Sequence, residues 1–427
     1  MPGFLVPYRV LDLSDERGLL AGAMLARLGA EVVQLEPLKG SSARRVGPFD
    51  PGVTAPDNSF FWSAYAAGKQ GLACDLASEE GRALVRRLLS KADFLIDSAD
   101  PGVMSTLGLG VEQVRAINPA LIHVSITAFG SEGPKAGYAA TDLTVWAAGG
   151  PMRLTRDGDR PPMRFSVAQT FLNAAADAAN AALIAHFARV QSGLGQHVDV
   201  SAQQSATLCT LAASLSAAYR HEGFTLGAAS GVKSNKKQLD LSGSGARTRR
   251  SKWQVRDGLV EMHLGIGPGS GRFTNNLFKW MLEEGACTVE MGEWDWVKLP
   301  QRIIDDKVTD DDLEHARTCV AQFFKRFSKE EMLEKALQHR FLCAPIANTQ
   351  DLLDSRQLES RNFFSTVVER SGHERKLPGK FAHGADGGFA PIRPAPSIGE
   401  HTDEILTEWL GLEGEAINQL RSQGVIA

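Results

Sequence analysis

A strand–helix–strand pattern in the first 36 residues is the feature that most constrains the fold of this chain. YRVLDLS at 8–14 is a short apolar strand, GLLAGAMLARLGA at 18–30 has helical spacing, and EVVQLE at 31–36 is a second strand. Three such elements in so short a span favour two parallel strands joined by a helical crossover. The pattern therefore predicts an α/β fold with a parallel sheet.

The alternation of helices and strands continues to about residue 130. EEGRALVRRLLSKA is an amphipathic helix, DFLID a strand, VEQVRAIN a helix and LIHVSITAFG another strand. We expect a doubly wound sheet, whose ligands bind beyond the carboxyl ends of the strands. After the first strand the chain has SDERG in place of a GxGxxG motif, which argues against a dinucleotide cofactor.

Composition divides the rest of the chain. The run from Phe171 to Val190 is nearly all Ala, Leu and Phe and predicts a buried helix. Residues 221–252 are rich in Gly and Ser, with seven Lys or Arg against two acids, which indicates a basic linker or a loop that neutralises phosphates. Asp257-Gly258 between two alternating runs indicates a hairpin. We expect a large Rossmann-like domain at 1–220, completed by 345–427, and a small α+β domain at 253–344.

Charge and cysteine content exclude several classes of protein. The net charge is -4 and the pI is about 6.2, so nothing indicates a nucleic-acid or membrane partner. The five cysteines are widely spaced and form no CxxC pair, which favours reduced thiols and no metal site. The N-terminus has no basic segment followed by an apolar run, and no stretch is long enough to span a bilayer. These observations predict a cytoplasmic location.

Seven segments, in order, resemble the class III CoA-transferases. They are MLARLGAEVVQLEP, GKQGLACDLASEEGRALVRRLLSKADFLID, PGVMSTLGLG, INPALIHVSITAFGSEGPKAGYAATDL, SGLGQHVDVS, CAPIANTQDLLDSRQLESRNFF and PAPSIGEHTDEILTEWLGL. The resemblance implies a Rossmann-like large domain built from both ends of the chain and a small central domain. It also implies an interlocked dimer, in which each chain threads through the other.

In enzymes of this family an aspartate attacks the thioester carbonyl of an acyl-CoA. The carboxylate forms a mixed anhydride and releases CoA thiolate, which then attacks the aspartyl carbonyl. Counting back from SGLGQ places Phe171 where the family has this aspartate, and neither Thr170 nor Leu172 is acidic. Asp177 is a weak alternative, because six residues move it about 9 Å along a helix. The resemblance thus implies acyl-CoA as substrate and a chain with no nucleophile of its own.

Further departures concern the residues around this position. The racemase branch of the family uses a histidine where Thr141 stands, so racemase chemistry is disfavoured. His123 lies in a core strand and is expected to be a buried histidine with its hydrogen bonds satisfied. Asp142 is expected to hold a loop by hydrogen bonds to backbone groups. DERGLLAG at 15–22 replaces a turn that contacts CoA in typical members.

The family match also suggests which residues contact CoA. Cations and strand-end amides suit its phosphates, and the matching positions are Lys39, Lys69, Ser98, Ala99 and Lys135. Leu38 and Thr106 stand where members often have an arginine. GIGPGSG, with Gly265, Gly267, Gly269 and Gly271, resembles the mobile glycine loop that closes over the site. The alternative for this segment is a plain turn in the small domain.

Three hypotheses follow for the function. The first is a subunit that moves CoA from a donor such as succinyl-CoA to a carboxylic acid beside an aspartate-bearing paralogue. In this it resembles the non-catalytic subunit of heteromeric members that act on an aromatic succinate such as benzylsuccinate. The second is a stand-alone acyl-CoA enzyme of the same fold, an isomerase, lyase or racemase-like protein, working as an interlocked homodimer. The third is a CoA-binding scaffold without catalysis.

Overall fold

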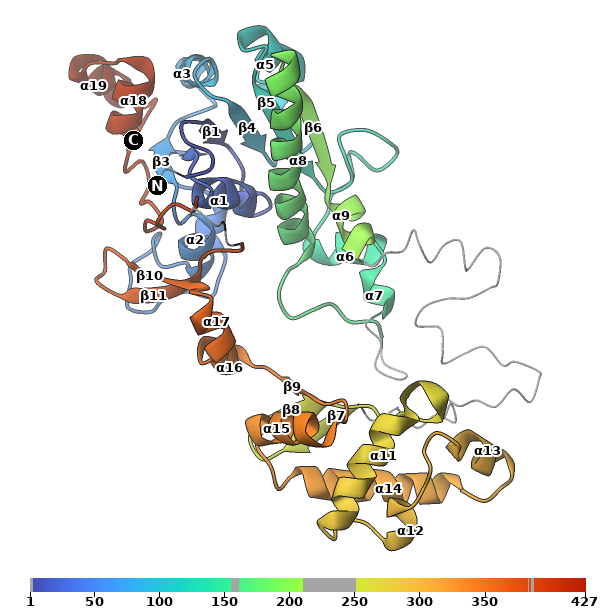
Figure 1. Ribbon diagram of the computed structural model, residues 1–427. Helices are drawn as coiled ribbons and strands as arrows, with labels where there is room; N and C mark the ends of the chain where they lie inside the picture. Colours follow the sequence, from blue (N-terminus) through green and yellow to red (C-terminus); the bar gives the residue numbers. More distant parts are fainter. Residues whose placement is uncertain (1–2, 155–160, 210–250, 383, 385–387) are drawn as a thin grey trace. The chain divides into compact units, whose positions relative to one another are not determined.

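The computed structural model describes residues 3–154, 161–209, 251–382, 384 and 388–427 (Figure 1). Contacts within the chain divide it into two compact units. The first contains residues 1–224 and 359–427, and the second contains residues 225–358. The basic linker predicted at 221–252 lies outside the described residues, except for Ser251 and Lys252.

Six parallel strands form the sheet of the first unit. They are β1 (Arg9–Asp12), β2 (Glu31–Glu36), β3 (Gln70–Ala73), β4 (Phe94–Asp97), β5 (Ile122–Thr127) and β6 (His197–Ser201). Their order across the sheet is β3-β2-β1-β4-β5-β6, and every neighbouring pair is parallel. The doubly wound sheet predicted from the sequence is therefore confirmed. Its strand order reverses between β1 and β4, where folds of this type bind ligands.

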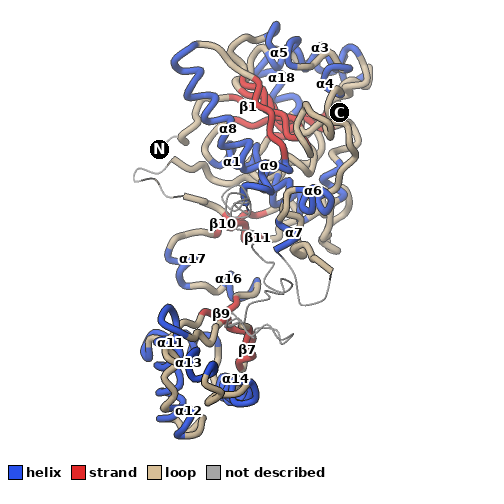
Figure 2. Tube along the Cα trace, turned by 90° about the vertical axis from the view of Figure 1, so that its right-hand side faces the viewer, coloured by secondary structure: helices blue, strands red, loops and turns tan. Residues whose placement is uncertain are grey.

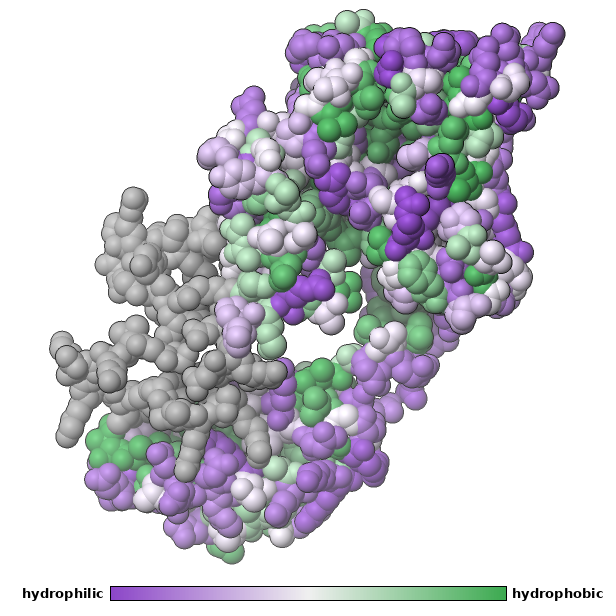
Figure 3. Space-filling view, turned by 180° about the vertical axis from the view of Figure 1, so that it is seen from behind, coloured by the Kyte–Doolittle hydropathy of each residue, from purple (hydrophilic) through white to green (hydrophobic). Residues whose placement is uncertain are grey.

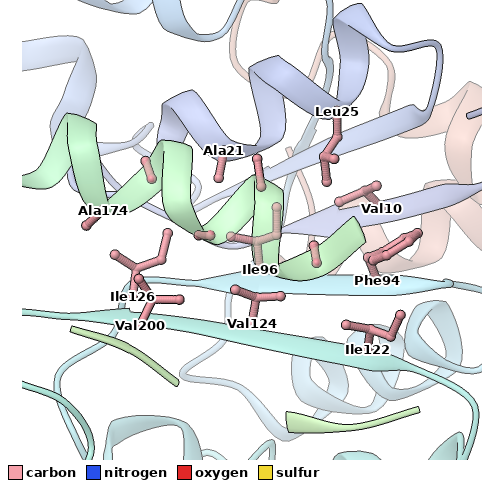
Figure 4. Close-up of a cluster of buried hydrophobic side chains, with 14 of the residues drawn as sticks. Val10, Ala21, Leu25, Phe94, Ile96, Ile122, Val124, Ile126, Ala174 and Val200 are labelled. Carbon is pink, nitrogen blue, oxygen red and sulfur yellow. The ribbon is translucent and has the colours of Figure 1, made fainter. Parts of the chain in front are cut away.

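Helices cover both faces of this sheet (Figure 2). On one face, α1 (Leu19–Arg27) and α8 (Thr170–Ser192) pack over apolar side chains of β1, β4, β5 and β6, several of which are labelled in Figure 4. The second apolar cluster covers the other face. Its helices are α3 (Glu79–Leu89), α5 (Val111–Ile117), α18 (Thr402–Leu410) and α19 (Gly414–Ser422). Residues from both ends of the chain thus share one core.

Local signals explain where α3 begins and ends. The Ser78 side chain accepts a hydrogen bond from the backbone N–H of Gly81, which caps the start of the helix. Two glutamates occupy its first turn and two arginines its last turn, as the helix dipole favours. Its buried residues recur at helical spacing, and they place one face of α3 against the sheet.

Helix α8 departs from the sequence prediction in one respect. The prediction was a helix buried along its length, but only the alanine-rich face is buried. Ile184, Phe187 and Val190 are 72%, 69% and 70% exposed. The periodicity explains the difference, because small residues recur on the face toward α1 and large apolar residues occupy the opposite face. The high overall hydrophobicity of the helix concealed this division.

Short elements complete the first unit. They are η1 (Ser42–Arg45), α2 (Phe60–Tyr65), α4 (Val103–Thr106), α6 (Asp142–Ala148), α7 (Pro151–Leu154), α9 (Ala202–Cys209), β10 (Phe364–Val368) and β11 (Glu374–Pro378). Strands β10 and β11 form an antiparallel hairpin. Val367 and Leu377 of the hairpin pack against Ala67 and Ala64, which places the hairpin beside α2 (Figure 1).

The second unit is α+β. Strands β7 (Lys252–Val255) and β8 (Gly258–Glu261) form the hairpin predicted around Asp257-Gly258, and β9 (Ala344–Ile346) pairs with β8. Because of this pairing the unit continues past the predicted boundary at residue 344 and ends at Leu358. Its helices are α11 (Gly267–Glu283), α12 (Val289–Gly292), α13 (Leu299–Ile304), α14 (Asp310–Phe324), α15 (Lys329–His339) and α16 (Thr349–Leu353). The boundary between the two units, after Leu358, falls within α17 (Arg356–Ser360).

The described helices include no candidate membrane span. None of them combines the length and the apolar character that crossing a bilayer requires. On the face shown in Figure 3, hydrophilic residues are spread over both units, with smaller apolar areas between them. This distribution is ordinary for a globular chain.

Candidate active site

The carboxyl end of β1 carries a buried ion pair. Lys69 Nζ donates to Asp12 Oδ2 at 2.7 Å, and neither side chain is exposed. The same ammonium donates to the carbonyl oxygen of Leu19 at 2.9 Å and to Gln34 Oε1 at 2.8 Å. Burial lowers the pKa of Lys69 against the opposing attraction of Asp12. All three ammonium donors are therefore used inside the first unit.

Gly22 of α1 makes room for this ion pair. A Cβ at Gly22 would lie 2.0 Å from Asp12 Oδ2 and 3.0 Å from Lys69 Nζ. The other carboxylate oxygen of Asp12 accepts from the backbone N–H and the hydroxyl of Ser14, at 2.9 and 2.6 Å. The predicted contact between Lys69 and a CoA phosphate does not fit this arrangement. A buried ammonium with three partners has no donor left for a ligand.

Charged groups of the SDERG segment lie between the carboxyl ends of β1 and β4. The backbone N–H of Asp15 donates to Ser98 Oγ at 2.9 Å, and that hydroxyl donates to Asp15 Oδ1 at 2.8 Å. Arg17 pairs with Asp15 at 2.8 Å and with Asp100 at 2.7 Å. The position where a doubly wound fold binds its ligand is thus lined here by an internal network with two carboxylates.

Two other predicted CoA contacts, Ser98 and Ala99, also donate hydrogen bonds within the chain. Ser98 is buried, and its hydroxyl donates to this chain's own carboxylate. The backbone N–H of Ala99 donates to Asp97 Oδ1 at 3.1 Å. Neither residue therefore offers a free donor to a phosphate in this arrangement, and both CoA contacts stay predictions. Sequence position placed all three near the strand ends, but it did not show that their donors were already used.

The two remaining predicted cations are exposed. Lys39 follows β2, and Lys135 lies in the segment after β5 with its Nζ 5.8 Å from the ring centroid of Phe129. Strands β1 and β4 lie between β2 and β5 in the sheet, so the two lysines follow the strands on either side of the switch point. Of the predicted CoA contacts, these two are the side chains that are accessible to a ligand.

The start of α8 lies beside the start of α6. The side chain of Asp142 accepts from the backbone N–H of Thr170 at 2.8 Å, and its carbonyl oxygen accepts from the Thr170 hydroxyl at 2.9 Å. These bonds agree with the structural role expected for Asp142. Thr141, at the racemase histidine position, caps α6 through a capping box with Thr144. Both residues therefore hold helix ends in this chain.

Phe171 is the second residue of α8. It is partly buried and packs against the apolar cluster beneath α1 and α8, and the first turn of the helix contains no acidic residue. Asp177 lies six residues later, about 9 Å farther along the axis and about 240° around it. Burial, and then the charge of Asp177, raises the pKa of Cys209 at the end of α9. Asp177 is thus near α9 and not on the face that carries Phe171.

A second buried ion pair follows β2 and was not predicted. Glu36 accepts from Arg44 at 2.6 and 2.7 Å, and the same guanidinium pairs with Asp57 at 2.6 Å and lies 3.9 Å from the ring centroid of Trp62. Arg44 and Trp62 both donate to the carbonyl oxygen of Pro396, at 2.8 and 3.0 Å. The cluster joins β2 to the C-terminal segment. The sequence gives no sign that Arg44 is buried while neighbouring Lys39 is exposed.

A polar network also connects β4, β5 and β6. His123 Nε2 lies 2.7 Å from Asp97 Oδ2, Ser125 Oγ donates to the same oxygen at 2.9 Å, and His197 Nε2 lies 3.0 Å from Ser125 Oγ. The expectation of a fully satisfied His123 holds for one ring nitrogen, since its buried Nδ1 has no partner among the described residues. The described residues include no group of three or more His, Cys, Asp or Glu placed to hold a metal ion.

We expect this network to make stability depend on pH. Burial first, and then the neighbouring His123, lowers the pKa of His197, while Asp199 and Asp97 act in the opposite direction and Arg115 in the same one. The unfolded chain therefore binds a proton at His197 more readily, and stability falls as the pH drops below about 6.5. In His197→Asn, urea unfolding between pH 7.5 and 5 should show a smaller fall. An unchanged pH dependence would contradict this assignment.

The glycine segment GIGPGSG is not an open loop in the second unit. Gly267 to Gly271 form the first turns of α11, and Gly267 donates through its backbone N–H to the carbonyl oxygen of Trp296 at 2.9 Å. A Cβ at Gly271 would lie 2.5 Å from that oxygen, so glycine allows the helix to approach Trp296 closely. Gly269 has open space around it. Pro268 within the first turn favours the helical start.

Comparisons with known proteins agree with this architecture. The family described as CoA-transferase family III matches residues 5–402. The chain belongs to this family. The resemblance seen in the sequence is thereby confirmed, and CoA transfer is the activity that goes with the family.

The relatives include one protein named as a subunit and others named simply as CoA-transferases. Subunit BbsE of succinyl-CoA:(R)-benzylsuccinate CoA-transferase from Thauera aromatica is 32% identical, over 98% of this chain and 97% of its own length. Formyl-CoA:oxalate CoA-transferase from Streptomyces coelicolor is 24% identical over 98% of each chain. The crystal structure of a CAIB/BAIF family protein from Brucella suis matches with a TM-score of 0.75 at 23% identity, covering 96% of this chain and 100% of that one. The last match supports the fold alone.

Proposed function

We propose that this family III chain is the subunit of a heteromeric CoA-transferase that lacks the nucleophilic aspartate. Its partner is a paralogous chain that carries the aspartate and forms the covalent intermediate. The heteromer moves CoA from a donor such as succinyl-CoA to a carboxylic acid, and the acceptor class we infer is an aromatic succinate. Similarity to the Thauera relative, a subunit of a benzylsuccinate CoA-transferase, supports both the subunit role and this acceptor class.

The start of α8 carries this proposal. The mixed-anhydride mechanism of this family needs a carboxylate at the reacting position, and the first turn of α8 has none. Phe171 instead places a partly buried ring there, packed against the core. An apolar ring can shape a pocket wall, but it cannot form an anhydride. Asp177 does not replace the missing group, because it lies on another face of the helix near α9.

The network around SDERG supports the same role. Asp15 lies between β1 and β4 with its carboxylate bonded to Ser98 and paired with Arg17. A carboxylate at this position repels a phosphate or a pyrophosphate, which makes the turn a poorer CoA site than strand-end amides alone would be. Exposed Lys39 and Lys135 are the contacts that we retain for CoA in this chain.

The exposed face of α8 supports an assembly with a second chain. Ile184, Phe187 and Val190 project from the side of α8 that faces away from α1, and Leu194 just beyond the helix is 61% exposed. These three side chains on one face of α8, with exposed Leu194 just beyond the helix, form a surface that a partner chain would cover. We propose that the paralogous subunit packs here, in the interlocked arrangement that the family resemblance implies.

Native mass spectrometry tests the assembly and its activity together. The chain is produced alone and with an aspartate-bearing paralogue, and each preparation is assayed for CoA transfer from succinyl-CoA to benzylsuccinate. We expect a heteromer in the second preparation and transfer only there. Homodimers that transfer CoA without a second chain would contradict the proposal. Ile184→Ser and Phe187→Ser should weaken the heteromer, whereas Leu337→Ser on the second unit, at an exposed site, provides a matched surface control.

A further inference from the structure

A cavity of about 200 Å³ lies between the end of α1 and the β10–β11 hairpin. Its lining includes Arg27 from the last turn of α1, Ser365 from β10, Lys380 just after β11, and Phe389. The backbone N–H of Ala390 donates to the carbonyl oxygen of Arg27 at 2.8 Å, which holds this wall against the helix end. The volume is sufficient for a small polyatomic anion together with water.

Arg27 is a half-buried cation. Its Nε is buried and has no hydrogen-bond partner among the residues that the structure describes. Burial lowers the pKa of Arg27, with a smaller opposing effect from Tyr65. The carbonyl end of α1 offers it only roughly half an elementary charge. The enclosed part of this guanidinium has lost contact with water without gaining a hydrogen bond from the described residues, which is unfavourable.

The rest of the cavity adds positive charge and donors. Lys380 provides a second cation, and Ser365 provides a hydroxyl close to the backbone of Gly379, where a Cβ would lie 2.4 Å from Ser365 Oγ. No acidic side chain is among the described residues that line the cavity. The nearby Lys69 is also cationic, and its charge is matched by Asp12. Among the described residues, the cavity thus combines two cations and a hydroxyl with no acidic side chain in its lining.

We propose that this cavity is an oxyanion site, in which Arg27, Lys380 and Ser365 bind a phosphate or carboxylate group of a small ligand. Arg27 supplies the planar donor pair that recognises such groups. Helix α1 runs from the carboxyl end of β1 back to the start of β2, so its last turn points toward the amino ends of the strands, although Arg27 is close enough to Lys69 to add to the effect of burial in lowering the pKa of that lysine. The site is therefore separate from the proposed transfer of CoA, and it does not depend on that proposal.

Calorimetric titration of the full chain tests the site. Inorganic phosphate and succinate are titrated separately into the wild type, Arg27→Gln and Lys91→Gln in a chloride buffer of constant ionic strength. Lys91 is exposed, lines no part of this cavity and gives the same change in net charge. We expect one of the two anions to bind with a stoichiometry of one, at least about 10-fold more weakly in Arg27→Gln and unchanged in Lys91→Gln. The anion that binds identifies the source of the oxyanion.

Melting temperatures distinguish a ligand site from a structural role of Arg27. Without phosphate or succinate, Arg27→Gln should melt at or above the wild-type temperature, because it removes an uncompensated charge. With the binding anion present at high concentration, the order should reverse. The proposal is overturned if neither anion discriminates between the variants. It is equally overturned if Arg27→Gln lowers the melting temperature by the same amount in every buffer, because Arg27 would then be paired with a carboxylate of the protein.

Discussion

Lys69→Met should lower the free energy of unfolding by about 3–5 kcal/mol. The substitution keeps the apolar stem of the side chain but removes the charge that faces Asp12, and both residues are fully buried. Asp12 would remain ionised or take up a proton inside the core, with two donors from Ser14 still directed at it. The carbonyl of Leu19 and the amide of Gln34 would each lose a partner as well. Urea unfolding followed by circular dichroism measures the loss.

Two further variants test whether the loss of stability comes from the buried ion pair. Arg86→Met removes one partner of the largely exposed pair between Arg86 and Glu79 and should change stability little, because water screens that pair. The double variant Asp12→Asn with Lys69→Met should recover part of the loss, since it leaves no buried charge. If Lys69→Met were no more damaging than Arg86→Met, the buried pair would contribute no more to stability than a largely exposed one, contrary to this prediction.

The sheet could be predicted because its pattern is local. Strands β1, β2, β4 and β5 are each a short apolar run next to a helical period, and parallel pairing follows once such units repeat, whereas β3 was not predicted. The hairpin at Asp257-Gly258 could be predicted for the same reason. Where α8 is buried could not be predicted in the same way, because its overall composition is apolar. Only its position against α1 decides which face meets the core and which remains open.

For the predicted CoA contacts, the sequence could not reveal which hydrogen-bond partners each residue already has. Ser98 and Ala99 follow the carboxyl end of β4 and Lys69 precedes β3, but their donors are used by Asp15, Asp97 and Asp12. A motif gives the order of residues along the chain, and it does not reveal which carboxylate from a distant segment reaches them. The partners of Lys69 and Ser98 lie 57 and 83 residues away in sequence.

The surroundings of Arg27 could not be predicted from the sequence either. In the sequence it is an ordinary basic residue in the last turn of a helix, where a cation is favourable. The enclosing wall comes from Lys380, Phe389 and their neighbours, more than 300 residues later. No sequence pattern in or near α1 indicates a cavity, because its walls come from both ends of the folded chain.

In the assembled heteromer, we expect the covalent intermediate to form on the paralogous chain and not on this one. Asp177→Asn in this chain should leave the rate of transfer unchanged, because Asp177 faces α9 and Phe171 holds the position of the nucleophile. Replacing the aspartate of the paralogue by asparagine should lower the rate at least about 10³-fold, as loss of a nucleophile does in other acyl-transfer enzymes. Both variants are assayed as purified heteromers, so that assembly is controlled.

The most direct measurement is the intact mass of each chain after the heteromer has been mixed with succinyl-CoA and quenched in acid. The account predicts an added mass of an acyl or CoA group on the aspartate-bearing paralogue, and an unmodified mass for this 427-residue chain. Hydroxylamine added before the quench should release the acyl or CoA group from the paralogue and leave its aspartate as the free carboxylate or the hydroxamate, as expected for an anhydride or a thioester. An adduct on this chain, at Asp177 or elsewhere, would contradict the account.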